Sequence, residues 1–206
     1  MKVEKFDYNS LDELLSNTYI VYEGNEAIIV DPGKEYQGIV NFLNKNELSP
    51  VAIFLTHGHF DHIRGVKTLL EAFPSLDVYI EVNDIEVASN PDINCSDFCN
   101  VKVSLDIDFK IIKDKDVIHL LNTDIKVIHT PFHTMGSVCY YFKNNNWLFT
   151  GDTLFMHGIG RYDLPTSNPR LISSSLGKLK ELPKDTKVFP GHGPNTTIGN
   201  EFVGLA

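Results

Sequence analysis

Three histidines and one aspartate lie close together in the sequence, at His57, His59, Asp61 and His62. Alternate residues of an extended segment point to the same side, so His57 and His59 can reach one ion together. Asp61 continues this alternation, His62 comes round as the chain turns into the next helix, and Gly58 lets the backbone bend closely around a metal. Imidazole nitrogens with a carboxylate oxygen are typical zinc ligands and also suit iron or manganese. The segment therefore predicts a metal site.

The elements around this segment are expected to place it at the edge of a sheet. Residues 51–55 (VAIFL) form a compact apolar run, which predicts a buried strand. Residues 63–73 carry apolar side chains on one helical stripe, and Pro74 predicts the end of that helix. The histidines thus follow the carboxyl end of a strand, which is a usual place for a functional site.

The remaining patterns predict strands and helices in both halves of the chain. Strands are expected at residues 19–22, 27–30, 77–80, 109–112, 117–120, 125–129, 138–142, 147–150 and 187–190. Helices are expected at residues 36–46, near residue 84 and at residues 169–182. No linker or internal repeat divides the sequence, so we expect one α/β domain over residues 1–206, with helices outside two sheets.

Composition and charge exclude several classes of partner. The 206 residues carry 27 acidic and 18 basic side chains, and the net charge of −9 argues against nucleic acid as the main partner. No apolar run approaches the ~20 residues that cross a bilayer, so no membrane span is expected. The first residues lack the apolar core of a secretory signal, and Cys95, Cys99 and Cys139 are an odd number. We therefore expect reduced thiols and a cytoplasmic location.

Five segments together resemble the metallo-β-lactamase-fold hydrolases, in which T-H-x-H-x-D-H precedes a further histidine, an aspartate and a last histidine. In chain order they are VDPG (30–33), THGHFDH (56–62), TPFHTMGS (130–137), FTGDTLF (149–155) and FPGHG (189–193). The resemblance spans nearly the whole chain. It implies an αββα sandwich of two mixed β-sheets, with helices on the outer faces and a metal centre at one edge.

The resemblance also implies the ligand set, position by position. One divalent ion would be held by His57, His59 and His133, and a second by Asp61, His62 and His192, with Asp152 bridging the two. Zinc is the expected metal, and iron or manganese would also suit these ligands. The ions would lower the pKa of a shared water so that hydroxide attacks the substrate, with Asp61 and Asp152 as the catalytic carboxylates.

Residues 156–165 indicate a branch of this family, because they resemble the G-x-G-R-T-D segment of short glyoxalase II-like thioesterases and of persulfide dioxygenases. The first group implies cleavage of S-acyl-glutathione or a related small-molecule thioester. Arg161 could bind a substrate carboxylate or could instead pair with Asp163, and both readings stay open. His157 and Tyr162 are further candidates for substrate binding.

Two alternatives accompany the thioesterase hypothesis. A persulfide dioxygenase would hold one iron through His57, His133 and Asp152. A non-catalytic metal-binding module would keep the ligands without turnover, and Phe132, which replaces the usual glycine before His133, could block the cleft in such a protein. The sequence ends shortly after His192, so we expect the helical extension of full-length glyoxalase II to be missing and the range of thioesters to be broad.

Overall fold

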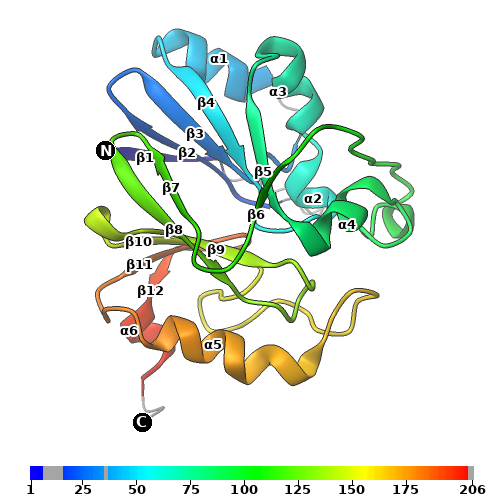
Figure 1. Cartoon of the computed structure of the whole chain (residues 1–206), viewed down its shortest axis with the longest axis vertical. Helices are drawn as coiled ribbons and strands as arrows, with labels where there is room; N and C mark the ends of the chain where they lie inside the picture. The colour runs from blue at the N-terminus through cyan, green and yellow to red at the C-terminus, as the bar shows by residue number, and fades with distance from the viewer. Residues whose placement is uncertain (7–15, 35–36, 204–206) are drawn as a thin grey trace.

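The computed structural model describes residues 1–6, 16–34 and 37–203, which form two sheets packed face to face (Figure 1). In the first sheet the strand order is β1 (Lys2–Phe6), β2 (Thr18–Glu23), β3 (Glu26–Val30), β4 (Ser49–Phe54), β5 (Asp77–Glu81) and β6 (Lys110–Ile112). In the second sheet it is β12 (Thr196–Thr197), β11 (Lys187–Pro190), β10 (Trp147–Gly151), β9 (Val138–Phe142), β8 (Thr123–His129) and β7 (Val117–Leu120).

Both sheets are mixed. In the first sheet, β1, β2 and β3 pair in antiparallel fashion, whereas β3, β4, β5 and β6 run parallel. In the second sheet, β7 to β10 are antiparallel, β11 runs parallel to β10, and β12 returns antiparallel. The predicted α/β fold with two mixed sheets is therefore confirmed.

Helices cover the outer faces of the two sheets (Figure 1). The α-helices are α1 (Gln37–Lys45), α2 (Phe60–Ile63), α3 (Val66–Ala72), α4 (Ile85–Ser89), α5 (Ile172–Lys180) and α6 (Ile198–Glu201). Short 3-10 turns are η1 (Val82–Asp84), η2 (Asp97–Cys99), η3 (Lys143–Asn145) and η4 (Pro169–Leu171). Helices α1 and α3 pack on the first sheet, and α5 and α6 pack on the second. Within the described ranges, no helix has the length and apolar character to span a membrane.

The strands are apolar on both faces because each face is covered. In β2, Tyr19 and Val21 point into the core between the two sheets, while Ile20 points outward into the layer beneath α1 and α3. Strand β9 shows the same alternation, since Tyr140 lies between the sheets and Tyr141 lies under the helices of the second sheet. Continuous apolar runs are typical of strands buried on both faces.

The helix predicted over residues 63–73 is present as α3, but it starts later than predicted, because a separate short helix, α2, ends at Ile63 and α3 begins only at Val66. The break falls at Gly65, whose amide donates to the carbonyl of Pro32 at 2.7 Å. A Cβ at Gly65 would lie 2.3 Å from the carbonyl oxygen of Lys34, so the two backbones touch here. Close approach of the residues before α1 therefore redirects the helix, and an apolar stripe does not report that contact.

Two other differences concern the ends of the chain. The strands predicted at residues 19–22 and 27–30 are present as the antiparallel pair β2 and β3, but β1 extends their sheet by one more antiparallel strand. The short β12 and α6 after residue 195 were not predicted either. A short edge strand gives little periodic signal, because its hydrogen bonds to a neighbour define it more than its own side chains do.

Candidate metal centre

The predicted ligands meet at one edge of the sandwich, although they come from four segments of the chain. His57 and His59 follow β4 of the first sheet. Asp152 follows β10 and His192 follows β11, two parallel strands of the second sheet whose carboxyl ends reach the same edge. His133 lies in the loop between β8 and β9.

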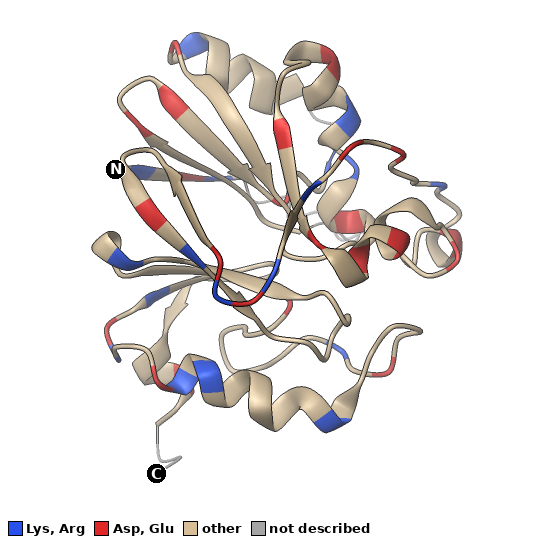
Figure 2. Cartoon of the chain, viewed as in Figure 1, with Lys and Arg blue, Asp and Glu red and all other residues tan. Residues whose placement is uncertain are grey.

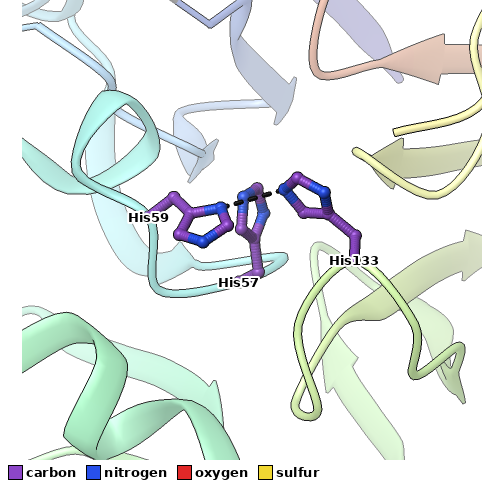
Figure 3. A group of neighbouring side chains, drawn as sticks. All are labelled: His57, His59 and His133. Atoms are coloured by element: carbon purple, nitrogen blue, oxygen red, sulfur yellow. Dashed lines mark hydrogen bonds between the residues drawn. The ribbon is translucent and has the colours of Figure 1, made fainter. Parts of the chain in front are cut away.

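Three histidines form the first group of donors (Figure 3). His59 Nδ1 lies 2.9 Å from His133 Nε2. The ring centroid of His57 lies 4.8 Å from that of His59 and 4.8 Å from that of His133. All three side chains are buried, and their donor atoms lie within 4.8 Å of one another. The group can thus offer three imidazole nitrogens to one ion.

Asp61, His62 and His192 form a second group of the same kind. His192 Nε2 lies 3.2 Å from Asp61 Oδ2, and His62 Nε2 lies 3.7 Å from the same oxygen. The second group therefore combines two imidazoles with one carboxylate, a set that suits zinc or iron.

Asp152 lies between the two groups. Its Oδ1 is 3.3 Å from His62 Nε2 in the second group. Its Oδ2 is 3.4 Å from His133 Nε2 in the first group and 3.6 Å from His192 Nε2 in the second. One carboxylate thus faces both sets of donors, which is the placement that a bridging ligand requires.

Hydrogen bonds fix which ring nitrogen of several histidines faces the cluster. His133 Nδ1 contacts the carbonyl oxygen of Arg161 at 2.7 Å, so Nδ1 donates and Nε2 is left toward the cluster. His62 Nδ1 contacts Asp31 Oδ2 at 2.9 Å, which leaves the Nε2 of His62 facing the cluster as well. Partners of this kind orient metal-binding histidines and raise their basicity.

The unpartnered atoms of the cluster fit a bound cation. His57 Nε2, His59 Nε2, His62 Nε2 and Asp152 Oδ1 are buried and have no hydrogen-bond partner among the described residues. A buried polar atom without a partner is unfavourable, and its presence calls for an explanation. Imidazole and carboxylate donors gathered in this way would be satisfied by divalent ions.

Electrostatics favours the metal-binding protonation states of three of these ligands. Burial, followed by the nearby His133, lowers the pKa of His59 to about 3. Burial, followed by the nearby His62, holds the pKa of His57 well below its usual value. Burial alone would raise the pKa of Asp152, but the charges of His192 and His62 lower it well below its usual range. At neutral pH, His57 and His59 are therefore neutral and Asp152 is ionised. For His62 and His192, burial lowers the pKa but the neighbouring carboxylates outweigh it and raise the pKa.

Two details of the segment after β4 differ from the prediction. Asp61 does not continue an extended segment, because it lies in α2, which begins directly after His59. Gly58 is required for packing rather than for bending around a metal. A Cβ at Gly58 would lie 2.8 Å from the amide nitrogen of Ala88 and 2.8 Å from the carbonyl oxygen of Asp84.

Sequence reasoning missed the role of Asp31, a buried residue that follows β3. Its Oδ1 accepts the amide of Thr56 at 2.8 Å, and its Oδ2 accepts the Thr56 hydroxyl at 2.6 Å. The same Oδ2 contacts His62, as described above. The VDPG segment was recognised as part of the family pattern, but only the pairing of β3 with β4 brings its carboxylate beside the histidines.

A cavity of about 230 Å³ opens over the cluster. Its walls include His59, Asp61, His133, Asp152 and His192 on one side. The other walls are largely apolar and include Phe60, Phe155, Ile159 and Leu164, with Cys95 and Arg161. The candidate ligands therefore face a space that can admit a small molecule.

The three predicted substrate residues differ in their placement. Arg161 lines the cavity but also pairs with Asp163, with Nε to Oδ1 at 2.9 Å and Nη2 to Oδ2 at 3.1 Å. The structure thus shows the internal pair that the sequence left open. His157 and Tyr162 are not among the cavity walls, and the His157 side chain is 78% exposed.

Phe132 does not block the cleft, although the non-catalytic alternative considered from the sequence relied on such a block. Its side chain is fully buried and is not among the residues that line the cavity. Its carbonyl accepts the amide of Asn168 at 2.8 Å, which ties this loop to the segment before η4. The residue before His133 therefore points into the protein interior, and the reason for expecting a blocked site is removed.

The three cysteines are free thiols. Cys139 is buried in β9, and Cys99 is exposed in η2. Cys95 lines the cavity, where burial, followed by the charge of Asp61, raises the pKa of its thiol to about 11. Cys95 is therefore a protonated thiol at neutral pH.

Comparison with known proteins connects this site to a family. The sequence profile of the metallo-beta-lactamase superfamily matches residues 11–192. A probable metallo-hydrolase of Streptococcus pyogenes is 38% identical over 192 residues, which cover 90% of this chain and 82% of that protein. Hydroxyacylglutathione hydrolase 1 of Vibrio vulnificus is 37% identical over 174 residues, which cover 84% of this chain and 60% of that enzyme.

Solved structures give the same result. The B3 metallo-beta-lactamase BLEG-1 has a TM-score of 0.90 and 33% identity, with coverage of 98% of this chain and 96% of that chain. TTHA1623, solved in a di-iron-bound form, has a TM-score of 0.83 and 34% identity, with coverage of 91% and 92%. The two mixed sheets, the histidine and aspartate cluster at their edge and these matches together show that the chain belongs to the metallo-beta-lactamase superfamily.

Proposed function

We propose that this protein is a thioester hydrolase that depends on two divalent metal ions, most naturally zinc. The observation that carries the proposal is the convergence of seven buried or half-buried donor side chains beside a cavity. These are His57, His59, Asp61, His62, His133, Asp152 and His192. Membership of a superfamily that contains metallo-hydrolases supports hydrolytic chemistry.

The residues of the site have separable roles in this proposal. Divalent ions bound here would lower the pKa of a water and polarise a carbonyl oxygen. The ionised Asp152 would hold both ligand groups together, since its Oδ1 lies near His62 of the second group and its Oδ2 near His133 of the first. Asp61 lines the cavity, so its carboxylate can also orient a proton of a water molecule next to the substrate.

The cavity supports a substrate with a weakly polar reacting group. Phe60, Phe155, Ile159 and Leu164 would contact an acyl chain or a thiol group and keep bulk water away from the reacting carbonyl. A thioester meets this description, because its sulfur accepts hydrogen bonds only weakly. The likeness to a hydroxyacylglutathione hydrolase adds to the support for this class.

The experiment uses protein from which metal has been removed and which is then reconstituted separately with zinc, iron and manganese. Each form is assayed on S-lactoylglutathione and on a short-chain acyl thioester without glutathione. We expect metal-dependent release of free thiol from at least one thioester. Thiol release that is absent from every metal form, or that persists without metal, would refute the proposal.

β-Lactam hydrolysis is a second candidate, since BLEG-1 is described as a B3 metallo-beta-lactamase and covers this chain almost completely. A chromogenic cephalosporin assayed on the same samples separates it from thioester hydrolysis. Oxygen consumption on glutathione persulfide by the iron form would instead indicate the dioxygenase. Turnover of either compound, with no thiol release from thioesters, would overturn the thioesterase assignment.

Other properties of the protein remain part of the proposal. We expect a small-molecule partner rather than nucleic acid, and Figure 2 shows basic and acidic residues interspersed over both layers in that view. The free cysteines fit the cytoplasmic location expected from sequence.

A further inference from the structure

Asp84 is a buried carboxylate close to the metal cluster that is not one of its donors. It is the last residue of η1, which follows β5 of the first sheet, and its side chain is 0% exposed. Carboxylates are rarely buried completely unless they have strong partners. Its partners therefore indicate why it is there.

Both oxygens of Asp84 accept hydrogen bonds from two different loops. Oδ2 accepts the amide of Gly58 at 2.8 Å and the hydroxyl of Thr134 at 2.7 Å. Oδ1 accepts the amide of Gly136 at 2.8 Å. Gly58 belongs to the loop after β4 of the first sheet, whereas Thr134 and Gly136 belong to the loop between β8 and β9 of the second.

The two loops carry the three histidines of the first donor group. Gly58 stands between His57 and His59, and Thr134 directly follows His133. We propose that Asp84 is a positioning residue that sets the spacing between the His57–His59 loop and His133. Through this spacing it tunes the affinity of the first metal site alone. This inference rests on the metal centre of the proposed function.

Two glycines make this contact possible. A Cβ at Gly136 would lie 2.6 Å from Asp84 Oδ1, which is closer than real contacts allow. A Cβ at Gly58 would lie 2.8 Å from the carbonyl oxygen of Asp84. Both loops therefore approach η1 through bare backbone, so the carboxylate can reach their amides directly.

A carboxylate has an advantage over an amide in this position. Asp offers two acceptor oxygens, while Asn offers one and would turn an NH₂ group toward one of the two loops. Burial raises the pKa of Asp84 to about 6, against the opposing effect of its three donors, so the charged form carries a cost. The second donor group is held differently, since Asp61 and His62 lie in α2 and His62 contacts Asp31.

The test measures the affinity of each site separately in metal-free protein. His192→Ala is used as a background that leaves the first donor group intact, and His59→Ala as a background that leaves the second group intact. Zinc affinity is measured by competition with a chromophoric chelator. In the first background Asp84→Asn should weaken binding about 10–100-fold, the usual effect of losing a residue that supports a metal ligand. In the second background the change should stay within about twofold.

Matched variants distinguish a positioning role of Asp84 from a general loss of protein stability. Glu81→Gln removes a buried carboxylate at the start of the same turn. Glu81 accepts from Asn83 and contacts neither metal loop among the described residues, so this variant should leave both affinities unchanged. Thr134→Val should weaken the first site, whereas Thr134→Ser, which keeps the hydroxyl, should restore it. Amide hydrogen exchange at Gly58 and Gly136 in the metal-free protein should speed up in Asp84→Asn.

The outcomes that overturn this role differ from those that overturn the proposed function. Equal weakening of both sites, or wild-type affinity of the first site in Asp84→Asn, would overturn the role of Asp84 while the metal centre stands. Absence of zinc binding by the wild-type protein and by the His192→Ala background would instead refute the metal centre itself.

Discussion

At the scale of single residues, Asp152 is the side chain that both donor groups share. Its Oδ1 lies 3.3 Å from His62 Nε2, and its Oδ2 lies 3.4 Å from His133 Nε2. Each group contains its histidines without Asp152, and this carboxylate places negative charge between the two groups. Two cations a few ångströms apart would repel one another, so charge between them has a large effect.

Replacement of Asp152 by Ala should therefore lower hydrolysis by about 10³-fold or more, equivalent to roughly 4 kcal/mol of transition-state stabilisation. It should also reduce the number of zinc ions that each chain retains. Thiol release and metal content are measured on the same sample. Asp124→Ala is the control, because Asp124 pairs with His119 at 2.9 Å on the protein surface. Normal hydrolysis by Asp152→Ala with full metal content would contradict the shared role.

Asp84 gives a prediction about pH. Burial raises its pKa to about 6, and the facing carboxylate Glu81 adds to this, whereas the unfolded pKa is about 3.9. The folded state therefore binds this proton more tightly than the unfolded chain does. The protonated carboxyl stabilises the fold below pH ~4, and this stabilisation is lost as pH rises through ~6. The side chain of Asp84→Asn does not titrate, so this variant does not lose stability in this way. The free energy of unfolding of Asp84→Asn relative to wild type should improve by about 2 kcal/mol between pH 4 and pH 7.

Urea unfolding of the two metal-free proteins across this pH range measures the difference. Identical pH dependence of wild type and Asp84→Asn would show that the Asp84 proton is not bound more tightly in the folded protein.

The donor residues could be predicted from sequence because their types and spacing are local signals. His57, His59 and His62 stand close enough together for the pattern to be read directly. Asp31 and Asp84 could not be assigned roles, because a carboxylate in a turn is common and its partner is set by strand pairing. The pairing of β3 with β4 brings Asp31 beside Thr56, and no residue near Asp31 in sequence indicates this.

At the scale of elements, the junction between β10 and the first sheet depends on a glycine. Gly151 ends β10 with φ of +46°, and a Cβ there would lie 2.1 Å from the hydroxyl oxygen of Thr56. That hydroxyl donates to Asp31 Oδ2, so a shift of Thr56 would disturb the residue that holds His62. The strand end therefore combines a left-handed backbone with close packing.

Gly151→Ala should destabilise the protein by about 3 kcal/mol or more, since it adds backbone strain and a collision. Gly24→Ala provides a matched control, because Gly24 has φ of +59° but nothing lies within 4 Å of its Cβ position. That variant should cost only about 1 kcal/mol. Both values come from urea unfolding of metal-free protein. Equal costs would mean that the contact with Thr56 has no energetic weight.

Helices and strands could be predicted where a long apolar pattern marks them. They could not be predicted where tertiary contacts determine their ends or their existence. The strands β4, β8 and β9 follow their apolar runs closely. The break between α2 and α3 depends on Gly65 touching the backbone of Pro32, which sequence periodicity cannot show. The short β12 exists through its pairing with β11.

At the scale of the whole molecule, the candidate ligands connect two sheets that otherwise meet through an apolar core. His57 and His59 come from the first sheet, whereas His133, Asp152 and His192 come from the second. An ion that binds only the folded protein stabilises it by RT ln(1 + [L]/Kd), about 4 kcal/mol at a thousandfold excess over Kd. Metal should therefore join the two layers and raise overall stability.

Zinc added to metal-free protein should raise the melting temperature by roughly 10 °C. Calorimetry with and without zinc measures the shift. The double variant His59→Ala with His192→Ala lacks one ligand of each group and should show little of it. A shift of equal size in the double variant would place the bound zinc elsewhere on the protein.

The layered arrangement could be predicted from the order of strands and helices together with the family resemblance. The pairing order within each sheet could not, because several orders would bury the same apolar faces. The structure supplies this order, and with it the edge at which β4, β10 and β11 all end.

The central claim is that one edge of the sandwich binds two metal ions, and anomalous diffraction from crystals grown with zinc tests it most directly. The account predicts two zinc peaks, one contacted by His57, His59 and His133 and the other by Asp61, His62 and His192, with Asp152 between them. Crystals in which these side chains contact no zinc, or in which the peaks lie at other residues, would contradict it.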